Sequence, residues 1–314
     1  MSNHYLLIKE IDIHKASAMN NYLVTGSPSL TSYAGYTDAI KIEIQNTINK
    51  QIKNINFSVI IHEYTFNEGI ESHVSYKQNE KPTGSVASLA SMKVEHTCNI
   101  KASFIINFDL EDVFLESNSE LIIKNKEELN LNISKLRMAG GHIKNTELNF
   151  VSFHDDLLYV MKSLQRASKG YFLKSADDLM IEYTEKFEGS ALKALTYALE
   201  FSKMKETEDN KKEFEKFLRE TGNRAKRRQL GWIVPTNVGY LAITEELNNL
   251  KGARSENAFV YVEPITSLIE CVHTSKIIRE YFKNKHVFNN LGIFFTSTYT
   301  EGEYRIKSIN NGEF

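Results

Sequence analysis

The densest positive charge in the sequence lies between residues 224 and 228, where four of five residues are cations. An arginine fork can donate two hydrogen bonds to one phosphate, and a lysine adds a compact charge. Trp232 follows, and its ring could stack on an unpaired base. Such residues are typical of single-stranded nucleic-acid binding, although the solvated end of a charged helix would contain the same ones. The four cations are Arg224, Lys226, Arg227 and Arg228.

A second phosphate-binding candidate is the Gly-Ser-Pro-Ser element at residues 26–29. It separates an expected strand from an expected helix, so Ser27, Ser29 and nearby backbone amides would lie at a helix N-terminus, where anions bind. The element lacks the second glycine and the Lys-Ser/Thr pair of a Walker loop. Ordinary helix capping explains the same residues, and the pattern alone favours capping.

A third candidate is the element that contains Arg137, Gly140 and Gly141. It offers a cation beside glycines that would let the backbone approach a ligand closely. A simple helix stop is the alternative, and for this element alone it is the better interpretation.

The histidines and cysteines form no catalytic or metal-binding pattern. None of the histidines belongs to a His-Glu-x-x-His motif, and the acids after His154 suit the first turn of a helix. Cys98 and Cys271 have neither metal-ligand nor disulfide spacing. We therefore expect no catalysis, no metal and no cofactor. The histidines considered are His14, His62, His142, His154 and His273.

Length and composition are those of an ordinary globular protein, which we expect in the cytoplasm. The 314 residues are 41% hydrophobic and 25% charged, with a net charge of −2. This charge argues against nucleic acid on every side of the protein but is compatible with a local basic groove. No apolar run is long enough to cross a membrane, and no export signal is visible at the N-terminus.

Hydrophobic periodicity predicts an α+β first half. The order strand, helix, strand, strand, helix, strand is that of a ferredoxin-like, or RRM-type, unit. Residues 67–91 lack clear periodicity and are predicted to form a long loop or mobile hairpin. The expected elements are strand 5–14, a helix capped by Ser27 or Ser29, strand 56–64, strand 92–110, helix 126–138 and strand 147–153. The apolar face of the first helix is Tyr33, Ile40, Ile44 and Ile48.

The second half adds a helical segment and closing strands. A densely charged, solvated helix pair is expected at 203–220. One or two helices are expected over 264–285, followed by a hairpin of 293–297 with 304–307. The expected divisions are 1–153, a ferredoxin-like core with a thumb-like hairpin at about 67–100; 154–223, a mostly helical insertion; and 224–314, strands and helices that complete the core.

Several segments carry a family resemblance when they are taken in order. The most telling is Gly231-Trp232-Ile233-Val234-Pro235, followed by Val238-Gly239-Tyr240. Singly these segments are weak, but together they resemble the Cas-five-type subunit, or second Csy protein, of type I-F CRISPR surveillance complexes. Spacing and length agree over nearly the whole chain. The other segments are 8–13, 26–36, 59–62, 136–143 and 259–263.

The resemblance implies a non-catalytic subunit of an antiviral ribonucleoprotein. Family members hold the 5′ handle of the guide RNA (crRNA) together with the large subunit, and their thumb packs on the first backbone subunit. Target DNA lies nearby through the complex, and a separate endonuclease matures the guide. The positions that match family elements are Ser27, Ser29, Arg137, Gly140, Gly141 and Trp232.

Two departures leave the branch of the family open. Where the family commonly has Trp-Gly-Phe-Pro, this chain has Thr25-Gly26-Ser27-Pro28, and a usual Gly-x-Trp is missing near residues 268–271. A variant without the large subunit, or a transposon-associated relative, would have other partners but would still hold RNA.

Two rival functions remain. A metal-independent, guide-processing endoribonuclease of the Cas-five type would need a general base, for which His14 and His142 are candidates. A free-standing RNA-binding module would be a stable monomer, and an exposed apolar patch would argue against it.

Overall fold

The structure of the protein is a computed structural model, and part of the chain is described. The basic cluster expected at 224–228 lies outside the described residues, as does the charged helix pair expected at 203–220, apart from Lys203. The described residues are 3–21, 24–67, 71–74, 92–110, 125–144, 150–154, 156–165, 169–203, 232–247, 258–283 and 291–309.

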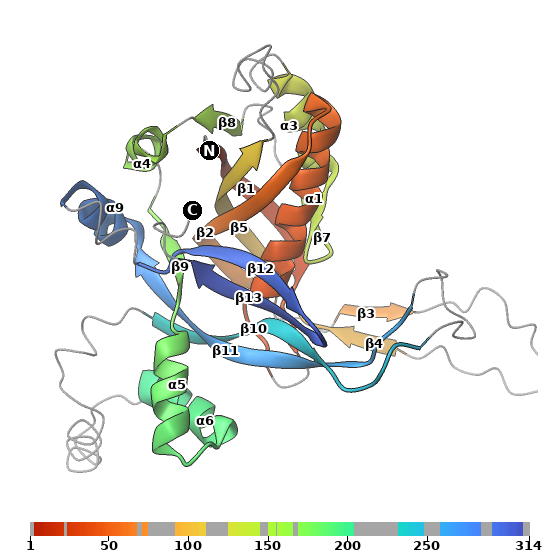
Figure 1. Cartoon of the computed structure of the whole chain (residues 1–314), viewed down its shortest axis with the longest axis vertical. Coiled ribbons are helices and arrows are strands. Elements are labelled where there is room, and N and C mark those ends of the chain that lie inside the picture. The colour runs from red at the N-terminus through yellow and green to blue at the C-terminus, as the bar shows by residue number, and fades with distance from the viewer. Residues whose placement is uncertain are drawn as a thin grey trace, which may run out of the picture.

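One large antiparallel sheet organises the described chain (Figure 1). Its strands are β1 (Asn3–Ser17), β2 (Ile52–Phe66), β5 (Thr97–Leu110), β6 (Arg137–Met138), β7 (Gly141–Ile143), β8 (Val151–His154), β9 (Tyr171–Ser175), β10 (Trp232–Ala242), β11 (Val262–His273), β12 (Phe294–Thr300) and β13 (Glu303–Ile309). Their order is β12, β13, β10, β11, β9, β2, β5, β1, β7 and β6, and β8 pairs with the first half of β1. A bridge between Phe295 of β12 and Phe57 of β2 closes six of these strands into a ring.

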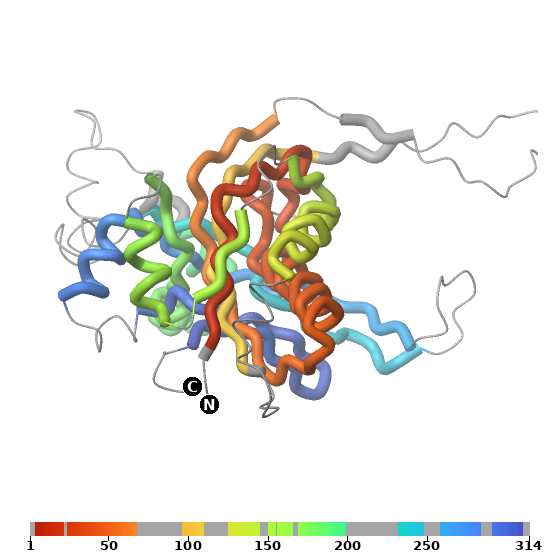
Figure 2. Tube along the Cα trace, turned by 90° about the horizontal axis from the view of Figure 1, so that it is seen from above, coloured from red at the N-terminus to blue at the C-terminus, as the bar shows by residue number. Residues whose placement is uncertain are grey.

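Two helices cover one face of the first-half strands, which lie in the order β8, β1, β5, β2. They are α1 (Leu30–Ile48) and α3 (Lys126–Lys135), and Figure 2 shows them on the same side of the sheet. The predicted apolar face of the first helix is confirmed, because Tyr33, Ile40, Ile44 and Ile48 are all buried. Tyr36 adds a ring contact with Phe104 of β5, at 5.1 Å between centroids.

The opposite face is covered only in part, by α4 (Leu157–Gln165) and α9 (Thr274–Lys283). Strand β5 contributes to the cores on both faces. Phe104 and Ile106 enter the core under α1, whereas Ile105 enters the core with α4 and α9. Burial on both faces explains why this stretch of sequence is almost continuously apolar.

One strand of the second half, β9, was not predicted, and another, β11, continues further than predicted. β9 lies inside the segment expected to be mostly helical and pairs with both β2 and β11. The prediction of helix over 264–285 is wrong for 264–273, where β11 continues to His273 and only α9 is helical. β11 is extended there because β9 and β10 satisfy its backbone on both sides. An ion pair of 3.0 Å between Lys174 and the buried Glu270 also joins β9 to β11.

The remaining described helices, α5 (Asp177–Lys186) and α6 (Ala191–Lys203), pack against each other and against Leu268 and Ile233 of the sheet. The predicted closing hairpin is confirmed as β12 paired with β13. Gly302 forms its turn at a φ of +77°, which suits glycine.

Two hairpins extend from the sheet. β3 (Glu71–Val74) pairs with β4 (Met92–Glu95) in the segment where a thumb-like hairpin was expected, and the residues that connect them are outside the described chain. The second hairpin continues β10 and β11 beyond the sheet (Figures 1 and 2). We call residues 241–247 and 258–263 the arm; its strands stay paired through Leu247 and Phe259, at 2.7 and 2.9 Å.

None of the described helices is long and apolar enough to cross a membrane. Within the described residues, no three His, Cys, Asp or Glu side chains are grouped so that they could hold a metal ion. Cys98 and Cys271 are both free.

Candidate nucleic-acid interface

The second face of the sheet is polar where α4 and α9 do not cover it. On β1, Ile13 enters the core under α1, so the adjacent His14 points to the opposite side. On β5, Ala102 enters the same core, so Lys101 and Ser103 lie on the side of His14. We call this region the open sheet face. It is formed by His14, His62, Lys101, Arg137 and His142, and Ser103 is buried beneath His62.

Three side chains form a cross-strand row at the edge of the open sheet face. His14 of β1 lies opposite His142 of β7, and His142 lies opposite Arg137 of β6. Directly opposed residues project from the same face with their Cβ atoms about 5 Å apart. Arg137 and His142 are exposed. The row therefore presents several hydrogen-bond donors to an anion that lies along the edge.

The predicted glycine element shapes the turn that supports this row. A Cβ on Gly141 would lie 2.8 Å from the backbone nitrogen of Ala16 and 2.8 Å from the carbonyl oxygen of His14, so a side chain would push β7 away from β1. Gly140, at a φ of +78°, makes the turn between β6 and β7. The two glycines thus bring Arg137 to the histidines.

The charge of the open sheet face is mixed at its centre and positive at its edge. At the centre, Lys101 forms an ion pair of 3.5 Å with Glu10. At the edge, Arg137 and Lys144 are exposed, and the acid beside them is Asp12, whose carbonyl oxygen accepts from the backbone N–H of Lys144 at 2.8 Å. A phosphate backbone would therefore be attracted most strongly to the edge.

His62 joins the centre of the open sheet face to the loop before β9. Its Nδ1 lies 3.1 Å from the carbonyl oxygen of Lys169, and its Nε2 lies 2.7 Å from Oγ of Ser103. A carbonyl oxygen can only accept, so Nδ1 carries the hydrogen and Nε2 accepts from Ser103. Ser103 Oγ also accepts from the backbone N–H of Glu10 at 2.8 Å. Burial lowers the pKa of His62, which favours the neutral ring that this network needs.

Ser29 has the contacts of a helix cap. Its Oγ accepts from the backbone N–H of Ser32 at 3.2 Å, and the residue is only 4% exposed. The N–H of Leu30 donates to Oγ1 of Thr236 at 3.1 Å. The Ser29 hydroxyl and the Leu30 N–H, two groups of the expected phosphate-binding element, therefore already have hydrogen-bond partners within the protein. Ser27 is half-buried. RNA contact by Ser27 and Ser29 stays a prediction.

Asn20, which the sequence did not single out, fixes the loop that carries Ser27. Its Nδ2 donates to the carbonyl oxygen of Ser27 at 2.8 Å, and its Oδ1 accepts from Oγ1 of Thr236 at 3.1 Å. Thr236 lies more than two hundred residues away in the chain, so no local sequence signal could have shown this connection.

Trp232 begins β10 and is 67% exposed, so its ring is accessible. It lies opposite Cys271 of β11 and belongs to a different part of the sheet from the row at Arg137. The structure therefore brings Arg137, Gly140 and Gly141 together with His14 and His142, while Ser29 and Trp232 lie elsewhere.

Comparison with protein families gives one match. The model of the family described as CRISPR-associated protein (Cas_Csy2) matches residues 6–282, which is most of the chain. A comparison with curated proteins found no match.

The neutral state of His62 should make the fold sensitive to acid. The pKa of His62 lies below its usual 6.5 in the folded protein, so between these values the unfolded chain binds more protons. The stability contributed by the neutral ring is complete above about pH 6.5 and is lost as the pH falls toward the folded pKa. Urea unfolding of wild type and His62→Gln at about pH 7.5 and about pH 5.5 measures this effect. The variant should lose less stability on acidification; an equal loss would place the sensitivity elsewhere.

Proposed function

The chain belongs to the Csy2 family of CRISPR-associated proteins, and from this premise we propose that it is a non-catalytic subunit of a type I-F surveillance complex. In this proposal it holds the 5′ handle of the guide RNA in antiviral defence. The target sequence is read by base pairing of the guide and not by this subunit.

The observation that carries the proposal is the open sheet face with its row of His14, His142 and Arg137. Small RNA-binding folds use a polar sheet face for single-stranded RNA, combining cations for phosphates with rings for bases. The row has both kinds of group, and it lies at the edge of the sheet, where β6 is the last strand of the order. Gly140 and Gly141 act by shaping the turn that positions Arg137.

A ferredoxin-like, or RRM-type, core is part of the same proposal. The order β8, β1, β5, β2, with α1 and α3 on one face, supports it. In such a unit the face opposite the helices is the one available to RNA. Here α4 and α9 occupy part of that face and leave the open sheet face beside them.

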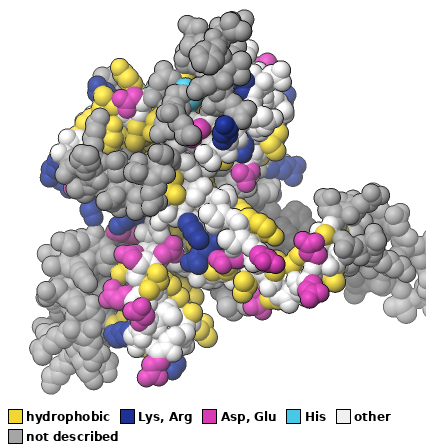
Figure 3. All heavy atoms as spheres, viewed as in Figure 1, with side chains coloured by type: hydrophobic (Ala, Val, Ile, Leu, Met, Phe, Trp, Pro, Cys, Tyr) yellow, Lys and Arg dark blue, Asp and Glu magenta, His cyan; other side chains and the backbone are white. Residues whose placement is uncertain are grey.

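The proposed protein partners are the large subunit and the backbone subunit, and the arm supports a protein contact. Six apolar side chains of the arm are exposed, with Ile243 at 56% and Tyr261 at 57%. Figure 3 shows apolar side chains together with acidic ones along this hairpin. An apolar, acidic surface repels phosphate but suits a protein partner with a basic rim. This argues against a free-standing RNA-binding module. The exposed apolar residues are Leu241, Ile243, Leu247, Val260, Tyr261 and Val262.

Arg137→Gln should weaken the binding of repeat-spacer RNA about tenfold, because one charge-assisted hydrogen bond to a phosphate is lost. The slope of the logarithm of affinity against the logarithm of salt concentration should fall by about one unit. Fluorescence polarisation of labelled RNA over a salt series measures both. Lys193→Gln removes an exposed cation from α6 and is the matched control. If both variants keep the wild-type slope, Arg137 does not contact phosphate.

Ile243→Ser with Tyr261→Ser should prevent assembly with the other subunits and leave the binding of RNA by the isolated chain unchanged. Both side chains are mostly exposed, so the fold loses little when they are replaced. Co-expression followed by size-exclusion chromatography detects the loss. Ile181→Ser, at an exposed isoleucine of α5, is the control. Assembly of the arm variant at the wild-type level would remove the arm from the interface.

The alternative function is a metal-independent endoribonuclease of the Cas-five type that processes repeat RNA, and one observation favours it. His14 and His142 lie directly opposite each other, so one could act as general base and the other as general acid. We expect repeat RNA to stay intact with the purified chain, because holding a handle requires no cleavage. A denaturing gel tests this. The ribonuclease would be favoured if the RNA is cleaved, if His142→Ala abolishes the cleavage, and if the control variant Lys193→Gln still cleaves.

A further inference from the structure

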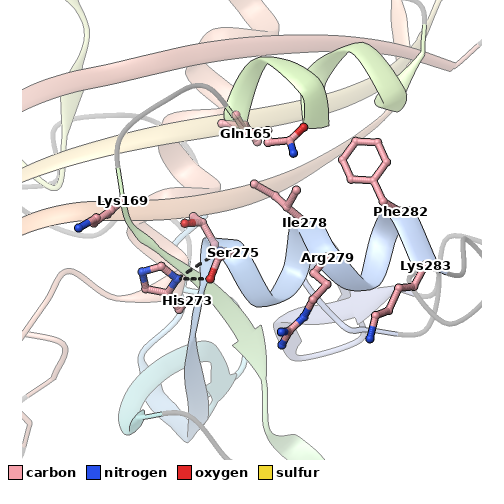
Figure 4. A pocket seen from close by; sticks show the side chains of 10 residues that line it. Gln165, Lys169, His273, Ser275, Ile278, Arg279, Phe282 and Lys283 are labelled. Carbon is pink, nitrogen blue, oxygen red and sulfur yellow. Dashed lines mark hydrogen bonds between the residues drawn. The ribbon is translucent and has the colours of Figure 1, made fainter.

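A pocket lies between the end of α4, the start of β9 and α9, apart from the row at Arg137. Its volume of about 650 Å³ is within the range of small-ligand sites. Figure 4 shows its labelled side chains. Its lining includes Lys169, His273, Arg279, Lys283, Phe282 and Ile278.

The pocket is lined by positive charge. Lys169 comes from the loop before β9, and Arg279 and Lys283 come from α9, where they lie one turn apart and project side by side (Figure 4). None of the described lining residues is acidic. Among the ion pairs of the described residues, none includes these three cations. The lining therefore favours a ligand with more than one negative charge.

Apolar side chains form another wall of the same pocket. Ile278 and Phe282 project from α9 toward α4 (Figure 4), and Leu164 of α4 lines the pocket as well. Phe282 is 45% exposed, so its ring is available to a flat partner. Base-aromatic stacking contributes about 1 to 3 kcal/mol in proteins that bind single strands. An anion with an aromatic ring satisfies both walls, whereas a simple inorganic anion satisfies only one.

The start of α9 closes the pocket and fixes its position. Nδ1 of His273 accepts from the backbone N–H of Ser275 at 3.2 Å, and the N–H of Thr274 donates to the carbonyl oxygen of Gly170 at 2.8 Å. The positive end of the α9 dipole therefore lies on the Lys169 side of the pocket, whereas Lys283 is in the last turn of the helix. Gly170 is required there, because a Cβ would lie 2.7 Å from Nδ1 of His62.

The pocket and the open sheet face lie on the same side of the sheet. His62 links them, since it bonds to Ser103 beneath the open sheet face and to the carbonyl oxygen of Lys169 at the pocket. β9 and β7 are separated by β2, β5 and β1, so β9 lies about 19 Å across the sheet from the strand of His142, the middle residue of the row. A short single strand of nucleic acid covers such a distance.

We propose that this pocket is a nucleotide site, in which Lys169, Arg279 and Lys283 bind phosphate and the ring of Phe282 stacks on the base. The nucleotide is either one unit of an RNA strand or a free nucleotide. The RNA source rests on the proposed function, in which case the strand continues from the open sheet face into the pocket.

The test uses the full chain with two probes. Saturation-transfer NMR with adenosine monophosphate should show transfer to the protons of the base in wild type, with loss in Arg279→Gln/Lys283→Gln and in Phe282→Ala. Polarisation of a labelled single-stranded RNA should show affinity about tenfold lower in the double variant, because phosphate contacts are lost. Lys276→Gln, an exposed cation of α9 outside the pocket lining, is the matched control for both probes.

The results of the two probes distinguish an RNA strand from a free nucleotide as the ligand of the pocket. Loss of both signals in the double variant assigns the pocket to an RNA strand, and loss of the nucleotide signal alone assigns it to a free nucleotide. The proposal is overturned if the base shows no transfer in wild type, if the variants leave it unchanged, or if inorganic phosphate displaces RNA as well as adenosine monophosphate does. Failure of wild type to bind RNA at all would instead count against the proposed function, whatever the nucleotide probe shows.

Discussion

The structure depends on the two-sided burial of β5. Its alternate side chains enter different cores, Phe104 under α1 and Ile105 beneath α4 and α9. A polar group buried on either face would cost free energy if it were unpaired, and the buried Asn107 accordingly donates to the carbonyl oxygen of His4 at 3.4 Å. On the second face Ser103 is still buried, and Lys101 is the first residue of this strand beyond it that is partly exposed. The open sheet face therefore includes Lys101.

The three proposed contact surfaces differ in electrostatic character. The edge at Arg137 and the pocket at Arg279 are positive, whereas the arm carries Glu245, Glu246 and Glu263 beside its apolar residues. Phosphate would be attracted to the first two and repelled by the arm. A chain of nearly balanced net charge can thus keep the proposed RNA-binding surfaces apart from the proposed protein-binding surface. The net charge of −2 gave no hint of this separation.

Local patterns predicted the elements that local forces determine. The apolar stripe of α1 and the closing hairpin of β12 and β13 follow from helical and alternating periodicity, and both were found. β9 was missed because it is only five residues long and its place depends on β2 and β11. Arg137 and its glycines were identified from sequence, but their neighbour His14 lies more than one hundred residues earlier. Ser29 was ambiguous in sequence, since a hydroxyl that caps a helix and one that binds phosphate occupy the same position.

The bridge from Phe295 to Phe57 has a consequence for how the protein folds. Strand β12 joins β2 across most of the chain, and β9, from the middle of the sequence, lies between β2 and β11. The ring of strands therefore cannot close until residues 294–300 have been synthesised. Pairings of such long sequence separation are slow to form, and the edge of β2 at Phe57 stays unpaired in the meantime. The nascent chain is thus exposed to aggregation until that late strand arrives, so the speed of translation and the presence of chaperones should affect its yield.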